Sequence, residues 1–302
     1  MPIYGKNGEI LSTVYDKNGN IITMAYDKSG NVIYNQSNPQ KKEWNYADYN
    51  ISTFFQYPIS SAQSFSIHDG KIAQIQENNS LHIIDIESGE KIRNVTMDMG
   101  HGNSCQFSDE FYNQDDEFPL FYERNDGIWV YRIVDTASIL IRKYSFPSSE
   151  VYTYVAGFGV DSKNGRFYTA SYTEGSYITK TGIMCICEYD MNNVTNNVDG
   201  TISMTLLRRN SFEWFDRFQA VQGCCYKDGY LFISTGYTGN TNQDVVLVNV
   251  STLTIDYVVS LGAGSEIEGC AWGDDYLIVG QRTNTYTYKK IEFAEISNEL
   301  NN

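Results

Sequence analysis

The sequence predicts an all-β protein whose larger part is a five-bladed β-propeller. No helical period of apolar residues lasts three turns in the 302 residues, whereas short runs of alternating Val, Ile, Tyr and Phe recur. From residue 51 onward, one strand motif also returns in five successive units. Strand-rich units that repeat roughly every 40 to 50 residues are typical of propellers.

The five units open with similar strands, which begin 40, 53, 66 and 46 residues apart. These strands are QSFSI (63–67), NSCQF (103–107), AGFGV (156–160), QGCCY (222–226) and EGCAW (268–272). Turns such as Asp69-Gly70 and Asp228-Gly229 follow them, because Gly supplies the positive φ of a tight hairpin. Second strands are predicted at 71–75, 166–171, 230–236 and 276–280, third strands at 80–86, 128–134, 183–189, 245–250 and 286–293, and fourth strands at 91–97, 140–146, 202–207 and 255–261.

The last unit ends without a fourth strand, while a spare strand at 51–59 precedes the first unit. We expect this N-proximal strand to pair with the third strand at 286–293. Such pairing would close the ring and remove the open sheet edges that invite aggregation. The propeller is therefore predicted to span residues 51–302.

The N-terminus repeats with a period of eleven, as YGKNGEI (4–10), YDKNGNI (15–21) and YDKSGNV (26–32). Gly and Asn between apolar residues predict hairpin turns. Three short strands bury too little surface to fold alone. Residues 1–35 are therefore predicted to be a β-repeat module for attachment or oligomerisation, and the polar residues 36–50 to be a linker.

The composition excludes several classes of partner. Lys and Arg number 22 against 37 Asp and Glu, a net charge of −15, so a phosphate-backbone binder is not expected. No run of about 18 apolar residues is present, and the start lacks the basic and apolar regions of a signal peptide. We expect neither membrane insertion nor secretion. The six cysteines are too few for a disulfide scaffold and are predicted to be free thiols.

The polar residues that open the units are the candidate site. The first strand of each blade lines the central channel of a propeller, so Gln63, Asn103, Gln222 and Glu268 should converge on one face. The predicted ligand-binding residues are His101, Asn103, Gln222, Glu266, Glu268, Tyr172, Tyr177, Tyr237 and Arg282. Tyrosines beside small polar residues suit stacking on sugars and hydrogen bonding to their hydroxyls. The alternative is a polar ring that only holds water and satisfies buried backbone groups.

Catalytic and metal sites are not predicted. Glu266 and Glu268 lie on one segment, whereas glycoside hydrolysis needs two facing carboxylates. Cys185 and Cys187 share one face of a strand, but no second pair lies at zinc-site spacing. No cofactor is expected, apart from a bound divalent cation as an open alternative.

Three motifs, GHGNS (100–104), QGCCYKDGYLFISTG (222–236) and EIEGCAW (266–272), resemble the five-bladed propeller of bacteriophage receptor-binding proteins, the relatives of so-called teichoic acid biosynthesis protein C. The N-terminal repeats are similar to modules of phage tail and baseplate proteins. The resemblance implies a homotrimeric virion protein made in the host cytoplasm. Its propeller would recognise a host cell-wall glycopolymer such as teichoic acid, and residues 1–35 would bind other virion proteins.

The resemblance carries over to His101, Asn103, Gln222, Glu266 and Glu268, which match the motif positions. A protein of charge −15 should be repelled by a polyphosphate. Recognition would then use sugar substituents or a bridging divalent cation.

The string at 222–236 also resembles plant-type glutaminyl cyclotransferase propellers. That resemblance implies an enzyme with a channel Glu as general acid or base. A purely structural virion component is the third alternative.

Overall fold

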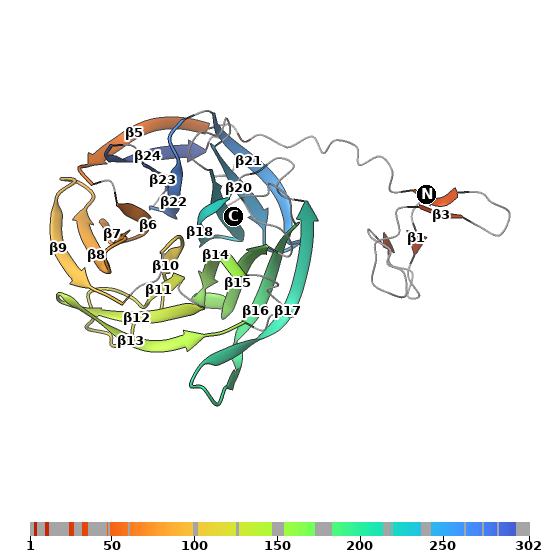
Figure 1. The fold of residues 1–302 in the computed structure, drawn as a ribbon, viewed down its shortest axis with the longest axis horizontal. Helices are drawn as coiled ribbons and strands as arrows, with labels where there is room; N and C mark the ends of the chain where they lie inside the picture. The colour runs from red at the N-terminus through yellow and green to blue at the C-terminus, as the bar shows by residue number, and fades with distance from the viewer. Residues whose placement is uncertain are drawn as a thin grey trace. The chain divides into compact units, whose positions relative to one another are not determined.

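The computed structural model describes residues 3–4, 10–11, 24–26, 32–35, 47, 49–59, 61–98, 102–124, 127–146, 154–172, 183–213, 218, 220–236, 243–262, 264–273, 275–282 and 284–293. The chain divides into two compact units, residues 1–44 and 45–302. Within the described ranges, the secondary structure is β-strand apart from one short 3-10 turn at Ser162–Asn164 (Figure 1). No helix among these residues is long and apolar enough to span a membrane.

The N-terminal unit contains two small hairpins. One joins β1 (Ile3–Tyr4) to β2 (Ile10–Leu11), and the other joins β3 (Met24–Tyr26) to β4 (Val32–Asn35). They coincide with the first and third of the eleven-residue repeats. Residues 12–23, which carry the middle repeat, and most of the predicted linker lie outside the described residues.

The larger unit consists of five four-stranded antiparallel groups of strands, here called sheets 1 to 5, arranged about a common centre (Figure 1). One parallel bridge, Thr96 with Ala137, joins sheet 1 to sheet 2, and another, Tyr144 with Ile202, joins sheet 2 to sheet 3. Sheet 1 is β6 (Ala62–His68), β7 (Lys71–Gln76), β8 (Ser80–Asp85) and β9 (Lys91–Thr96); sheet 2 is β10 (Cys105–Phe107), β11 (Phe121–Arg124), β12 (Ile128–Val134) and β13 (Ala137–Tyr144); sheet 3 is β14 (Tyr154–Asp161), β15 (Arg166–Tyr172), β16 (Ile183–Asn196) and β17 (Ile202–Glu213). Sheet 4 is β18 (Val221–Lys227), β19 (Tyr230–Thr235), β20 (Gln243–Asn249) and β21 (Thr254–Gly262); sheet 5 is β22 (Ile267–Trp272), β23 (Leu277–Arg282), β24 (Tyr286–Phe293) and β5 (Tyr49–Tyr57).

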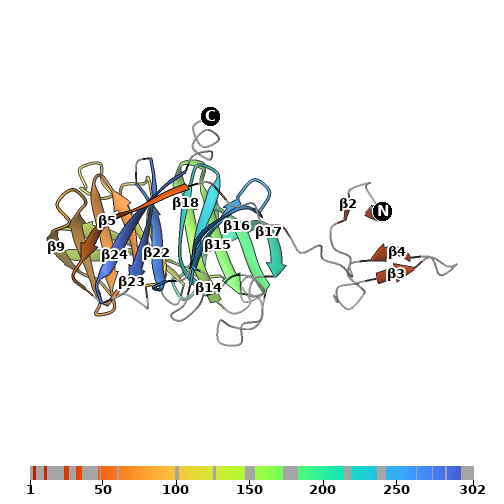
Figure 2. The same ribbon diagram turned by 90° about the horizontal axis from the view of Figure 1, so that it is seen from above.

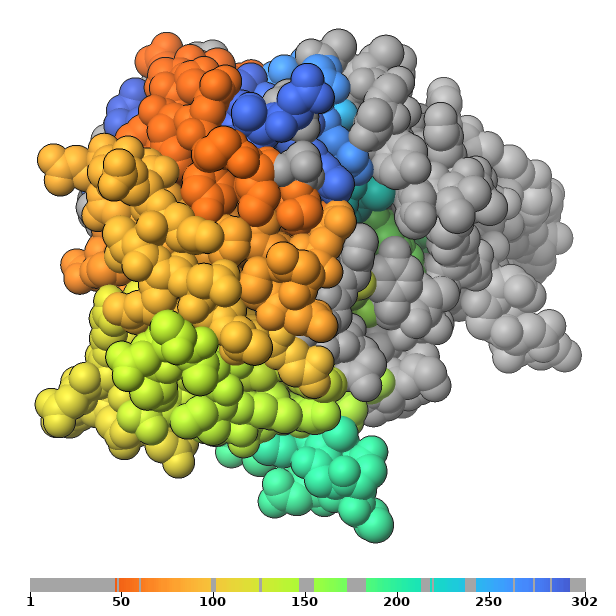
Figure 3. All heavy atoms as spheres, turned by 60° about the vertical axis from the view of Figure 1, so that its left-hand side comes forward, coloured from red at the N-terminus to blue at the C-terminus, as the bar shows by residue number. Residues whose placement is uncertain are grey.

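The first strand of each sheet is innermost, and the strands run from one face of the unit to the other (Figure 2). β16 and β17 are longer than the other strands, and their shared hairpin end protrudes (Figures 1 and 3). The predicted strands are confirmed within a few residues, except that β16 continues to Asn196, into the hairpin, and β17 continues to Glu213, at the end away from the hairpin. The second strand of sheet 2, β11, was not predicted, because an irregular connection over 108–120 separates it from β10.

The fourth strand of sheet 5 comes from the N-proximal segment. β5 pairs antiparallel with β24, from Tyr57 opposite Tyr286 to Tyr49 opposite Phe293. The strand is shifted two residues toward the N-terminus relative to the predicted range 51–59. It ends at Tyr57 because Pro58 follows, and proline has no N–H to donate to a sheet.

β-Bulges repeat at equivalent places in the sheets. In four of the five first strands the pairing shifts at the start of the strand, at Gln63-Ser64, Ala156, Gln222 and Glu268. Every fourth strand also leaves at least one residue unpaired: Ile92, Ile141, Leu207, Asp256 and Phe54, with Leu261 as a second one in β21. A bulge bends its strand and redirects a side chain, so the first-strand bulges determine where the polar residues point.

Apolar clusters fill the spaces between neighbouring sheets. Sheets 1 and 2, 2 and 3, 4 and 5, and 5 and 1 each share such a cluster. Between sheets 3 and 4, Tyr168 stacks on Tyr226 with ring centroids 5.5 Å apart. Packing therefore connects every neighbouring pair, including the last sheet with the first.

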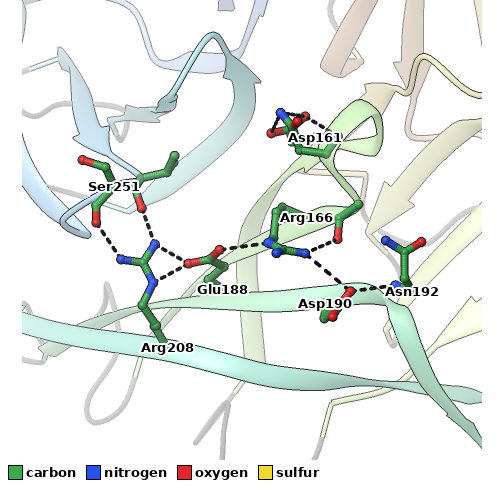
Figure 4. Close-up of polar contacts among 10 residues, drawn as sticks. Asp161, Arg166, Glu188, Asp190, Asn192, Arg208 and Ser251 are labelled. Atoms are coloured by element: carbon green, nitrogen blue, oxygen red, sulfur yellow. Dashed lines mark hydrogen bonds and ion pairs between the residues drawn. The ribbon is translucent and has the colours of Figure 1, made fainter.

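An ion network also joins sheets 3 and 4 (Figure 4). Arg208 of β17 forms a salt bridge with the nearly buried Glu188 and donates to the carbonyl oxygens of Val250 and Ser251, at 2.8 and 2.6 Å. Arg166 contacts the other oxygen of Glu188 at 3.3 Å. The network lies between strands and turns, so we assign it to stability.

Small residues lie where the first strands of sheets 4, 5 and 1 approach one another. A Cβ atom on Gly223 would lie 2.8 Å from the Cα atom of Gly269, and a Cβ on Gly269 would lie 3.0 Å from the Cα of Ser64. The first strands of sheets 4, 5 and 1 can approach this closely only because glycine occupies these positions.

Candidate functional site

Strand direction places the predicted polar residues on one face of the larger unit. First strands begin on this face and second strands end on it, because neighbouring strands are antiparallel. Gln222 and Glu268 are bulge residues of β18 and β22, and Arg282 is the last residue of β23. Side chains from three sheets can therefore meet here.

Six side chains on this face make two neighbouring sets of contacts, one around Arg282 and one between Gln222 and Glu266. Together we call them the rim cluster: Gln63, Glu77, Gln222, Glu266, Glu268 and Arg282. Arg282 Nη1 lies 3.1 Å from Glu77 Oε1 and 3.2 Å from Glu268 Oε1, so it joins sheets 5 and 1. Gln63 Nε2 donates to the same oxygen of Glu77 at 2.8 Å.

The contact between sheets 4 and 5 uses an amide. Gln222 Nε2 donates to Glu266 Oε1 at 2.5 Å and to the carbonyl oxygen of Gly236 at 3.2 Å. The rim cluster thus contains three carboxyl groups, two amides and a single guanidinium.

Glu268 has the most perturbed environment in the cluster. Its side chain is nearly buried, with 3% of the residue exposed. Burial first, and then the neighbouring Glu266, raise its pKa to about 7 against the opposing effect of Arg282. Near neutral pH this carboxyl is therefore divided between its acid and base forms, so it can donate or accept a proton.

The structure brings together four of the nine predicted site residues: Gln222, Glu266, Glu268 and Arg282. Asn103 precedes β10 on the same face, and its Oδ1 atom is buried and accepts no hydrogen bond from the described part of the chain. His101, Tyr177 and Tyr237 lie outside the described residues.

Tyr172 occupies a different place from the one expected. It is the last residue of β15, it is almost completely buried, and its hydroxyl accepts a hydrogen bond from the Val221 N–H at 2.7 Å. Its ring therefore braces sheet 3 against sheet 4 and is not presented as a loop residue to a ligand. The sequence identified Tyr172 as an aromatic residue with a polar group, but it did not indicate where its side chain points.

Gln63 was expected on this face, but neither Gln63 nor Glu77 was among the nine predicted ligand-binding residues. Repeat equivalence could have identified Glu77, since Gln76-Glu77 and Gln281-Arg282 end their second strands in the same way. The backbone N–H of Glu77 donates to Ser61 O, and that of Arg282 donates to Glu266 O, at matching places.

No group of three or more His, Cys, Asp or Glu side chains among the described residues is placed to hold a metal ion. The rim cluster nevertheless offers carboxylate and amide oxygens beside each other. These groups can bind the hydroxyls of a polar ligand, and Glu268 can exchange a proton.

Comparisons with known proteins concern the fold. Neither the protein-family models nor the curated proteins include a match to the chain. Among solved structures, the chain is similar to Myxococcus xanthus glutaminyl cyclase, with a TM-score of 0.50 and 10% identity over 83% of this chain and 100% of that chain. It is also similar to Kuenenia stuttgartiensis hydrazine synthase, with a TM-score of 0.42 and 10% identity over 76% of this chain and 58% of that chain. The chain has an all-β fold similar to that of five-bladed β-propeller proteins.

Proposed function

We propose that this protein is a phage virion receptor-binding protein whose larger unit binds a host cell-wall glycopolymer through the rim cluster. The observation that supports this proposal is the convergence of amide, carboxyl and guanidinium groups from sheets 4, 5 and 1 on one face. Paired donors and acceptors of this kind match the hydroxyl and amide groups of sugars.

Charge defines which part of a glycopolymer is recognised. The rim cluster has three carboxyl groups against one guanidinium, in a chain of net charge −15. A phosphate group is repelled by such a surface. The ligand is therefore bound through its sugar substituents, and a bridging divalent cation is the alternative for a teichoic acid.

The proposal also includes the assembly. The hairpins of residues 1–35 are too short to be stable alone, and in the proposal they attach the protein to other virion proteins. β5 closes the propeller ring. Three copies bind together, and effective concentration raises their avidity by roughly 10² to 10⁴ without new contacts. Native mass spectrometry tests the trimer directly.

Adsorption to cell walls tests the proposed function. Purified walls from a panel of Gram-positive bacteria, with and without their teichoic acid, are incubated with the full-length protein. We expect Gln222→Ala and Glu268→Ala each to weaken adsorption at least tenfold while the melting temperature is kept. The matched control is Glu87→Ala, in the exposed turn between β8 and β9 on the opposite face. Adsorption that both rim substitutions leave unchanged would refute the proposal.

The environment of Glu268 favours a second candidate function, that of an enzyme of the glutaminyl cyclotransferase type. A nearly buried carboxyl with a pKa of about 7 suits general acid or base catalysis. Incubation with a glutamine-initial peptide discriminates the two: an enzyme releases ammonia, and Glu268→Gln abolishes the release. A purely structural virion component shows neither turnover nor adsorption.

A further inference from the structure

The connection between β10 and β11 stands out among its equivalents. In the other four sheets the first and second strands are joined by short segments, at 69–70, 162–165, 228–229 and 273–276. In sheet 2 the connection spans 108–120. It lies on the face opposite the rim cluster, because first strands end there. Irregular loops of this length in compact domains are commonly functional.

Ion pairs, a hydrogen bond and packing attach this loop to sheets 1, 2 and 3. Its buried Phe118 stacks on Phe107 with centroids 5.6 Å apart. The N–H of Asp109 donates to Ser162 Oγ of sheet 3 at 2.8 Å. Three arginines of sheets 1 and 2 each bind one loop carboxylate: Arg93 with Glu117 (2.7 Å), Arg132 with Asp116 (2.6 Å) and Arg142 with Glu110 (3.0 Å).

The loop presents two consecutive aromatic residues to solvent, Phe111 and Tyr112, which we call the aromatic platform. Phe111 is 39% exposed and Tyr112 is 52% exposed. The Phe111 ring meets His68 edge-on at 5.8 Å, and the Arg132 guanidinium lies 5.2 Å from the Tyr112 ring centroid. Each ring therefore contacts the protein while a large part of it remains exposed to solvent.

The charges around the platform select against an anionic ligand. The three arginines nearest the loop each face a carboxylate. Asp109 and Asp115 add further negative charge on the same loop. A phosphate would find no guanidinium that is not already opposed by a carboxylate, whereas hydroxyl groups would find carboxylate acceptors beside an apolar ring face.

We propose that the aromatic platform is a second saccharide-binding site, separate from the rim cluster, which takes an uncharged or amine-bearing sugar ring. The apolar C–H face of the sugar packs on Phe111 and Tyr112, and nearby loop carboxylates accept its hydroxyl hydrogens. Because the loop is already ordered, binding does not require the loss of much conformational freedom.

The experiment uses the full-length protein on a printed array of bacterial surface saccharides. The variants are Tyr112→Ala, the double variant Phe111→Ala with Tyr112→Ala, and the conservative Tyr112→Phe. Glu268→Ala serves as the rim variant. We expect binding to at least one saccharide to weaken roughly tenfold or more in the double variant and to be kept in Tyr112→Phe and Glu268→Ala.

Several results would overturn the site. These are no binding by the wild type, binding that is unchanged in both alanine variants, or binding lost only in Glu268→Ala. A lower native mass of the double variant would instead show that a second copy of the chain covers the platform. Tyr112→Ala removes the contact with Arg132 but keeps the Arg132–Asp116 ion pair and the contact of Phe111 with His68, so its melting temperature should fall less than that of the double variant.

Discussion

At the scale of single residues, Glu268 combines a strand bulge, burial and a neighbouring carboxylate. Its pKa of about 7 in the folded chain lies above its ordinary value of 4.5. Between pH 4.5 and 7 the native state binds more protons than the unfolded state. The contribution of Glu268 to the free energy of unfolding is therefore fully present below about pH 4.5 and is lost as the pH rises through 7.

Glu268→Gln should remove this pH dependence. We expect the variant to be more stable than the wild type at pH 8, by on the order of 2 kcal/mol, and to lose that advantage near pH 4.5. Urea unfolding at several pH values measures the effect. Glu87→Gln, in an exposed turn, should follow the wild-type profile. Equal pH slopes for Glu268→Gln and the wild type would contradict the assigned environment.

Gly223 tests the close approach of the inner strands. A methyl group there would meet the backbone of Gly269 at 2.8 Å, and a backbone cannot move aside as a flexible side chain can. Gly223→Ala should therefore destabilise the protein by about 1 to 3 kcal/mol in thermal unfolding. The control is Gly264→Ala, where the new atom would meet only the Gln281 side chain, at 3.9 Å. Equal melting temperatures for the two variants would show that the inner strands are less tightly packed.

At the scale of elements, Arg208 links β17 to the turn between β20 and β21. Arg208→Ala removes two hydrogen bonds to carbonyl oxygens and leaves Glu188 with Arg166 alone. We expect a loss of about 1 to 3 kcal/mol, because the remaining Glu188 carboxylate is nearly buried. Denaturant unfolding measures it against Lys290→Ala, which breaks an ion pair within one strand. A loss no greater than that of the control would place the stability of this interface in apolar packing.

β5 supplies the fourth strand of sheet 5 from the opposite end of the sequence. Deleting residues 1–60 removes this strand and exposes the edge of β24, so the shortened protein should fail to fold. Deleting residues 1–40 keeps β5 and should leave the larger unit folded. Circular dichroism and thermal melting of both proteins measure the difference. A stable 61–302 fragment would show that the ring does not depend on β5.

At the scale of the whole molecule, the six cysteines are free and buried. Even the close pairs form no disulfide bond. The sulfurs of Cys185 and Cys187 are 3.7 Å apart, and those of Cys225 and Cys270 are 3.9 Å apart. Reductant should therefore leave the melting temperature unchanged in differential scanning calorimetry. A sizeable drop would mean that at least one pair is bridged in the purified protein.

The sequence by itself determined the strands and their repetition. Alternating apolar residues and glycine turns are local signals, which is why β12 and β24 were predicted to the residue. The same local pattern identified Gln222 and Glu268 as equivalent polar positions. The irregular segment before β11 carries no such period, and that strand was missed.

Only the tertiary structure decided which polar residues meet. Arg282 reaches Glu77 from 205 positions away in sequence, and no spacing along the chain encodes that contact. Gln222 and Glu268 are bulge residues, and a bulge changes the direction in which a strand's side chain points. The direction of the Tyr172 side chain also depends on packing between sheets. Its hydroxyl accepts a hydrogen bond from Val221 of sheet 4, and its position in its own strand does not predict that partner. The local sequence specifies which residues form strands and on which face of the unit they lie, whereas the packing of one sheet against another specifies which side chains are in contact.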